Sequence, residues 1–349
     1  MPTTAPSFEP APLTQETAFA APAPGLAVSQ ESSARRFLQE RGGGGLLDRG
    51  FGLAMALCAC SVFVIAVLIL GVLLVRSAPA WHAFGLRFFV GMRWNPVQGR
   101  FGALPFLFGT LLTSALALTI AVPLALGVAV FLTEMCPARL RAPLSFLTEL
   151  LAAIPSVVYG LWAIAVLVPL VRDWIGPPLE KTLGWTGLFR GPNFGVGLLT
   201  AGLVLAIMVL PVISSIARDV MRAVPDAQRE AVLALGATRW EMVRMGVLRN
   251  ARAGIAGAVI LGLGRALGET MAVTMVIGNH PAISRSLLAP SYTLASVIAN
   301  EFTEATGDLY VSALVEIGLA LFLLTIAVNA IARLLVWGVS RNAAAGARA

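Results

Sequence analysis

Six long apolar segments constrain the fold of this chain more than any other feature of its sequence. They cover approximately Phe51–Val75, Leu104–Leu132, Leu144–Leu170, Gly195–Ile216, Ala253–Ile277 and Leu309–Trp337. Each is at least as long as the roughly 20 helical residues that cross the hydrocarbon core of a bilayer. Only 12% of the residues are charged, whereas soluble domains contain about a quarter. The sequence therefore predicts an all-α membrane protein with six transmembrane helices.

The basic residues predict the orientation of these helices. Sixteen of them fall on one side of the predicted membrane and eight on the other, which places both termini in the cytoplasm. Residues 1–45 are then a disordered cytoplasmic tail, residues 46–340 the six-span domain, and residues 341–349 a cytoplasmic C-terminal tail. The net charge is +7, but the basic residues flank apolar segments. We therefore expect membrane lipid as a partner and no nucleic acid.

The longest predicted cytoplasmic loop, residues 217–252, has the capping signals of two short helices. Asp226 is a candidate N-cap of the first, and Gly236 a candidate stop at its end. Thr238 and Glu241 have the spacing of a capping box for the second. Helices this short are unstable alone in water, so the pair needs a surface, either the bilayer or a partner protein. Trp240 is the candidate anchor for a partner protein.

The stretch GLGRALGETMAV, Gly262–Val273, places two charged residues inside the fifth apolar segment. Arg265 lies twelve residues from either end of that segment, roughly 18 Å at the helical rise. An arginine at this depth costs about 2.5–3.5 kcal/mol on insertion scales, so it is expected to face the protein interior and to be paired. Glu269 is four residues further on, hence on the same face of a continuous helix. The spacing predicts an Arg265–Glu269 pair.

Two roles for this pair remain open from the residues alone. A buried ion pair can fix the register of a helix. Alternatively, the guanidinium binds an anion such as phosphate, and Glu269 holds the arginine between transport events. Ionisable residues inside a membrane usually line a transport path, which favours the second role. The Thr270 hydroxyl and the acid Glu316 in the sixth segment are further candidate path residues.

The residues give little support to an enzyme. The ATP-binding pattern G-x-x-x-x-G-K-[ST] does not occur, so the chain is not expected to hydrolyse ATP. No Ser/His or His/Asp set lies at membrane depth. The three cysteines and two histidines form no ligand set, and we expect no cofactor and no metal. The cysteines are Cys58, Cys60 and Cys136.

Several motifs resemble those of a known family. EAVLALGATRWEMV, which begins at Glu230, resembles the EAA loop of the inner-membrane permeases of binding-protein-dependent ABC importers. Glu230, Ala231 and Gly236 match the pattern of that loop, whereas Gly246 and Arg249 depart from it. WNP with FGALPF, ELLAAIPSVVYGLWA and GLGRALGETMAVTMVIGN together resemble the C-type permease subunit of phosphate-specific transport systems. The similarity runs from about Ala78 to the end of the last span.

This resemblance implies a type I ABC importer permease fold in a bacterial inner membrane, forming half of a path for inorganic phosphate. Glu230, Ala231, Gly236 and Trp240 would belong to a coupling helix that docks on a cytoplasmic ATPase. The implied partners are a homologous second permease, two copies of the ATPase and an extracytoplasmic phosphate-binding protein. One alternative is a permease for another oxyanion, such as sulfate or molybdate. Another is a secondary anion carrier or channel, for which inverted repeats or broken helices are expected.

Overall fold

The computed structural model describes residues 45–346, and the side chains of residues 48–337. The chain divides into two compact units, Met1–Val67 and Leu68–Ala349. The described part of the first unit is the beginning of helix α2 and contains no other element. The second unit is helical, and one isolated bridge between Asn95 and Arg100 is the β-pairing found in the described residues.

The helices of the described chain fall into long membrane-length elements and short connecting ones. The longer helices are α2 (Gly45–Phe84), α4 (Leu104–Val130), α5 (Ala138–Ala153), α9 (Leu198–Arg222), α12 (Arg249–Gly268) and α15 (Asp308–Gly346). The shorter helices are α3 (Arg87–Val90), α6 (Ser156–Trp162), α7 (Val168–Leu170), α8 (Gly176–Leu183), α10 (Asp226–Ala234), α11 (Arg239–Glu241), α13 (Met271–Val276) and α14 (Leu294–Glu301). Four π-helical turns, η1 (Phe131–Met135), η2 (Ala163–Leu167), η3 (Val171–Ile175) and η5 (Met242–Leu248), and one 3₁₀ turn, η4 (Gly184–Thr186), continue or join them.

The structure confirms six segments that are long and apolar enough to cross a membrane. Within the described residues they are Asp48–Phe84, Leu104–Met135, Ser156–Thr186, Leu198–Arg222, Arg239–Gly268 and Asp308–Trp337. Helix α15 continues to Gly346, beyond the predicted end of the membrane domain at residue 340. Residues 1–44 of the predicted N-terminal tail, and residues 347–349, lie outside the described residues.

The predicted boundaries of the third span were wrong. The sequence predicts a span over Leu144–Leu170 that is kinked at Pro155, but the chain forms α5, leaves the helix at Ile154 and starts again at Ser156. Pro155 has no N–H to donate and disfavours the helical conformation of the residue before it. Ile154 is accordingly extended, with φ −65° and ψ 129°. Helix α5 therefore packs on α9 as a separate element, and the spanning segment begins after the proline.

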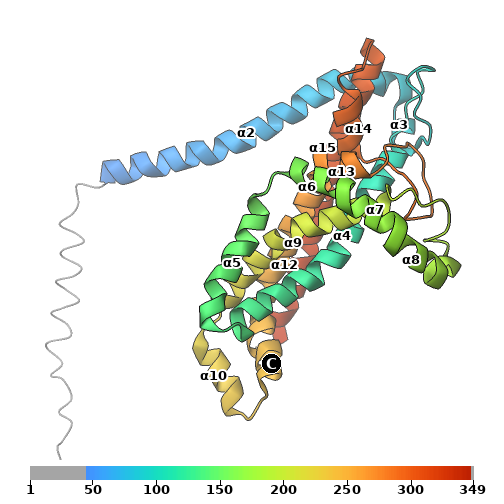
Figure 1. Ribbon diagram of the computed structural model, residues 1–349. Coiled ribbons are helices and arrows are strands. Elements are labelled where there is room, and N and C mark those ends of the chain that lie inside the picture. Colours follow the sequence, from blue (N-terminus) through green and yellow to red (C-terminus); the bar gives the residue numbers. More distant parts are fainter. Residues whose placement is uncertain (1–44, 347–349) are drawn as a thin grey trace, which may run out of the picture. The chain divides into compact units, whose positions relative to one another are not determined.

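Helix α9 is the packing centre of the second unit, because α4, α5 and α12 all contact it (Figure 1). Small residues permit the close approach. A Cβ added to Gly202 of α9 would lie 2.5 Å from the Leu116 side chain of α4. One added to Gly262 of α12 would lie 2.7 Å from Ile213 of α9. Four α4 alanines at a spacing of four residues are fully buried, namely Ala117, Ala121, Ala125 and Ala129.

A hydrogen-bonded aromatic cluster closes the end of the bundle that lies away from α10. Trp94 Nε1 and the Tyr310 hydroxyl each donate to Glu301 Oε2 at 2.7 Å. Asn300 Nδ2 donates to the hydroxyl of Tyr292 at 3.1 Å. Burial raises the pKa of Tyr292 to about 12, so this hydroxyl keeps its proton at neutral pH. The network ties α14 to the start of α15 and to the loop before α4.

Candidate substrate path and coupling site

The fifth span is interrupted at the predicted charged motif. Helix α12 ends at Gly268, and Glu269 is extended, with φ −70° and ψ 129°. The chain becomes helical again at Met271, where α13 begins. Glu269 Oε1 accepts a hydrogen bond from the Ala272 N–H at 3.4 Å. The carboxylate therefore caps the first turn of α13 instead of continuing the face of α12.

The predicted Arg265–Glu269 pair is not formed. Among the ion pairs of the described residues none involves Arg265. The spacing of four residues brings two side chains together on a continuous helix, but the chain leaves the helix between these two. Thr270 remains beside Glu269, and its hydroxyl donates to the Gly268 carbonyl at 3.3 Å. Three of the predicted path residues are thus gathered at one helix break.

The prediction that Arg265 faces the protein interior was wrong for this chain. Its side chain is exposed, three residues before the end of α12. Gly257, Leu261 and Gly268 are exposed on the same face of α12, and we call these four residues the open face of α12. Beside it, α12 and α15 border a groove of about 470 Å³. Tyr159 lies in α6, after the Pro155 break. The Tyr159 hydroxyl donates to the Leu151 carbonyl at 2.7 Å across the Pro155 break.

Glu316 lies apart from the break. Gly264 of α12 faces Asn329 of α15, and Glu316 precedes Asn329 by 13 residues, about 20 Å along a helix. Its side chain is fully buried, and both carboxyl oxygens lack a hydrogen-bond partner in the described chain. Arg265, Glu269 and Thr270 therefore lie at or next to one helix break, whereas Glu316 lies in a separate buried position.

The α10–α11 loop has the predicted capping with one exception. Gly236 has φ +83° and ends α10, and Thr238 and Glu241 form both bonds of the capping box. The predicted N-cap was wrong, because Asp226 is the first residue of α10 and Pro225 precedes the helix without a side-chain bond. The Asp226 carboxylate instead accepts from Arg229 at 3.0 Å. This loop contains all four predicted coupling residues, Glu230, Ala231, Gly236 and Trp240, and all are exposed.

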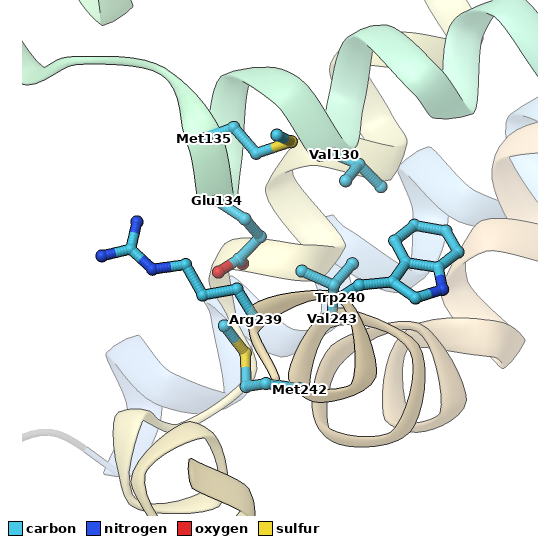
Figure 2. A pocket seen from close by; sticks show the side chains of 7 residues that line it. All are labelled: Val130, Glu134, Met135, Arg239, Trp240, Met242 and Val243. Carbon is cyan, nitrogen blue, oxygen red and sulfur yellow. The ribbon is translucent and has the colours of Figure 1, made fainter. Parts of the chain in front are cut away.

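A pocket of about 190 Å³ lies between this loop and the end of the second span. Figure 2 shows Glu134 and Met135 of η1 on one side, with Arg239, Trp240 and Val243 of the loop on the other. Trp240 forms one wall of the pocket, and 65% of its surface is exposed. An exposed tryptophan beside an apolar pocket is typical of a protein interface.

Three arginines of α5, α9 and α10 were not recognised from the sequence as residues with specific contacts. Arg229 of α10 pairs with Glu134 of η1 at 3.1 Å. Arg218 of α9 pairs with Glu149 of α5 at 2.9 Å. The third, Arg141 of α5, donates to the Thr133 carbonyl at 3.1 Å. All three are among the sixteen basic residues counted on one side of the predicted membrane. That count predicts orientation and gives no information about the contacts of each residue.

No set of metal ligands is gathered in the part of the chain that the structure describes. No group of three or more His, Cys, Asp or Glu side chains is close enough together there to hold an ion. The three cysteines are free. The groups at the break in the fifth span are a guanidinium, a carboxylate, a hydroxyl and the backbone groups of the helix ends.

Six spans, a broken helix with an exposed arginine and a capped helix pair on the surface define a permease subunit of a multi-component transporter. Residues 121–341 match the family model described as binding-protein-dependent transport system inner membrane component. The chain belongs to this family.

Proteins of known name extend the match to most of the chain. The phosphate transport system permease protein PstC of Mesorhizobium japonicum is 46% identical over 317 residues, 89% of this chain and 94% of the relative. The PstC protein of Haemophilus influenzae is 49% identical over 285 residues, 80% of this chain and 90% of the relative. An inward-facing structure of the MetNI methionine ABC transporter has 17% identity and a TM-score of 0.50, and covers 71% of this chain and 99% of its own. The last likeness confirms the ABC importer permease fold.

Membership in the family determines the general setting of the chain. It is a multi-pass membrane protein of a bacterial ABC system and a transport subunit, with an ATPase and a binding protein as partners. ATP hydrolysis takes place in the ATPase subunit.

Proposed function

We propose that this chain forms half of an ATP-driven path for inorganic phosphate across the bacterial inner membrane. The observation that carries the proposal is the exposed Arg265 beside the break in the fifth span. Charged side chains at membrane depth face a bundle interior or a water-filled cavity. Non-helical backbone at that depth is tolerated only where it is buried in protein or lines such a cavity. Both features therefore require a cover other than lipid.

A homologous second permease supplies this cover in our proposal. The open face of α12 includes Gly257 and Gly268, and a Cβ added at either would meet nothing within 4 Å in this chain. Small residues on a spanning helix let a second helix approach closely. Two such faces would enclose a path between the subunits, with Arg265 directed into it.

The chemistry of the break fits phosphate better than sulfate. The Arg265 guanidinium can bind two oxygens of a tetrahedral oxyanion at once. The Thr270 hydroxyl is a further hydrogen-bonding group, and Glu269 is an acceptor when ionised. Phosphate still carries a proton at neutral pH and can donate it to Glu269, whereas sulfate has none to donate. Sulfate would therefore be repelled by the Glu269 carboxylate and could not offset that repulsion with a donated hydrogen bond. A repulsive contact of this kind lets a site reject a similar ligand.

The remaining assignments complete the complex. Both termini are cytoplasmic, so the α10–α11 loop faces the cytoplasm and docks on the ATPase through Glu230, Ala231, Gly236 and Trp240. Two ATPase copies serve the two permeases, and an extracytoplasmic phosphate-binding protein delivers the anion. In this assignment Glu316 becomes a path residue when the packing around α15 opens during transport. PstC relatives that are 46–49% identical over most of their length support the cargo.

Uptake of radiolabelled phosphate by cells without their own uptake systems tests the proposal. The cells carry this chain with its neighbouring subunits, either wild type, Arg265→Gln or Glu269→Gln. Arg252→Gln is the matched control, because Arg252 is exposed on the same helix near its other end. Loss of a charge-assisted hydrogen bond predicts about 10- to 100-fold slower uptake for Arg265→Gln. Glu269→Gln is expected to let sulfate compete.

Two results would contradict the proposal. Wild-type cells that accumulate labelled sulfate or molybdate in preference to phosphate would assign the path to another oxyanion. Undiminished phosphate uptake by Arg265→Gln, at normal levels of assembled complex, would make Arg265 a packing residue.

A further inference from the structure

Arg229 connects helix α10 to two spans through a single guanidinium. Its Nη2 donates to Glu134 Oε1 at 3.1 Å and to the Met221 carbonyl at 2.9 Å. Its Nη1 donates to the Asp226 carboxylate at 3.0 Å and to the Val224 carbonyl. Glu134 belongs to η1, which continues the second span, and Met221 lies in the last turn of α9, the fourth span. We call these contacts the Arg229 clamp.

The clamp is largely shielded from water. The side chain of Arg229 is 16% exposed and that of Glu134 is 7% exposed, whereas Asp226 is 88% exposed. The bond to Glu134 is therefore the ion pair least weakened by solvent. A guanidinium is planar with donors in a fixed arrangement. Its four acceptors, on η1, α9, α10 and the turn between α9 and α10, therefore fix its orientation as well as its position.

Other contacts join α10 to the fifth span and do not depend on the clamp. Asn250 Nδ2 of α12 donates to Gln228 Oε1 of α10 at 2.7 Å. Helix α10 also packs on η5, which leads into α12. A chain without the clamp would therefore keep α10 attached, but hinged on the fifth span and free to shift relative to the second and fourth.

We propose that Arg229 is a positioning residue that makes α10 move as one body with the ends of the second and fourth spans. This inference rests on the proposed function, in which α10 receives the movement of the ATPase. The clamp then sets how much of that movement reaches the helices that enclose the path. Loosening it lets ATP hydrolysis proceed with less transport.

The experiment measures phosphate transported per ATP hydrolysed by the purified complete complex in proteoliposomes. The variants are Arg229→Gln, Glu134→Gln and the double variant. Arg222→Gln is the control, because Arg222 is an exposed arginine in the last turn of α9, next to Met221. We expect the ratio to fall at least about five-fold in both single variants. ATP hydrolysis should stay near the wild-type rate. Because both residues act through one bond, the double variant should lose no more than the worse single one.

Several outcomes would overturn the proposal that the Arg229 clamp couples ATP hydrolysis to transport. They are an unchanged ratio, a parallel loss of hydrolysis and transport at normal assembly, or additive losses in the double variant. If Glu134→Gln does not assemble, Arg229→Lys provides the same readout, since it keeps the charge and loses the planar geometry. A wild-type complex that transports another oxyanion refutes the proposed cargo, and the ratio for that anion still tests the clamp.

Discussion

The carboxyl group of Glu316 is an unfavourable feature at the scale of a single residue. It is fully buried, and neither oxygen has a hydrogen-bond partner within the described part of the chain. A buried polar group without a partner costs about 1–3 kcal/mol, and more when it is charged. Costs of this kind persist where function requires the group. The unpaired acid is therefore in keeping with a role in transport.

Glu316→Leu should stabilise the subunit and impair its function. The substitution removes the unpaired oxygens and retains an apolar side chain of similar size, so the free energy of unfolding should rise by about 1–3 kcal/mol. Thermal unfolding of the detergent-solubilised complex measures this gain, and phosphate uptake should fall several-fold. Glu316→Gln separates charge from polarity. A stabilised variant with full uptake would remove Glu316 from the proposed path.

Arg265 and Glu269 show which part of a site is encoded locally. Hydropathy and depth predicted an arginine that faces the protein interior and is paired, whereas the structure leaves it exposed on this chain, beside a helix break. The same-face pairing was wrong because it assumed a continuous helix. Gly268 followed by Glu269 and Thr270 is a local signal for a helix stop and a new start. The apolar residues on both sides concealed that signal.

At the scale of elements, the α10–α11 loop was largely predictable, because its turn and capping bonds join residues at most three apart. Gly236 and the Thr238–Glu241 box are examples. The Arg229–Glu134 bond joins residues 95 positions apart and depends on how α10 packs beneath the spans. No local sequence pattern indicates a contact between residues so far apart. The helix pair of the loop was therefore predictable from the sequence, and the Arg229 clamp was not.

Trp240 is expected to be the main apolar anchor for the ATPase. Interface tryptophans commonly contribute at least about 2 kcal/mol, which corresponds to roughly 30-fold in affinity. We expect Trp240→Ala to weaken binding of the purified ATPase to the solubilised permease by about that factor. Trp240→Phe retains an aromatic ring and should weaken binding only a few-fold. Equal affinity for wild type and Trp240→Ala would place the docking contact on another part of the loop.

At the scale of the whole molecule, the number and order of the spans followed from apolar length alone. The disturbance at Pro155 followed from the proline itself. The break at Glu269 did not, because bilayer thickness constrains how far a segment must reach and not whether its helix is continuous. Broken helices were named as a feature expected of a secondary carrier, and one occurs here in a member of the importer family. In the proposed function, a second permease covers the open face of α12 and completes the path.

The central claim is that the break in the fifth span lines an aqueous path for the anion. Gly268→Cys tests it most directly, because a side chain added there meets nothing within 4 Å and Arg265 is retained. Cys58, Cys60 and Cys136 are first replaced by alanine, and transport by this background is verified. Leu323→Cys is the control, an exposed apolar position of α15.

The measurement is the rate at which a charged, membrane-impermeant thiol reagent modifies the assembled complex. We predict that the Gly268→Cys variant is modified, that phosphate slows the reaction, and that the Leu323→Cys variant does not react. A transporting complex in which the thiol at position 268 is as unreactive as the one at position 323 would contradict the account, because the break would then be covered by protein or lipid and not by water.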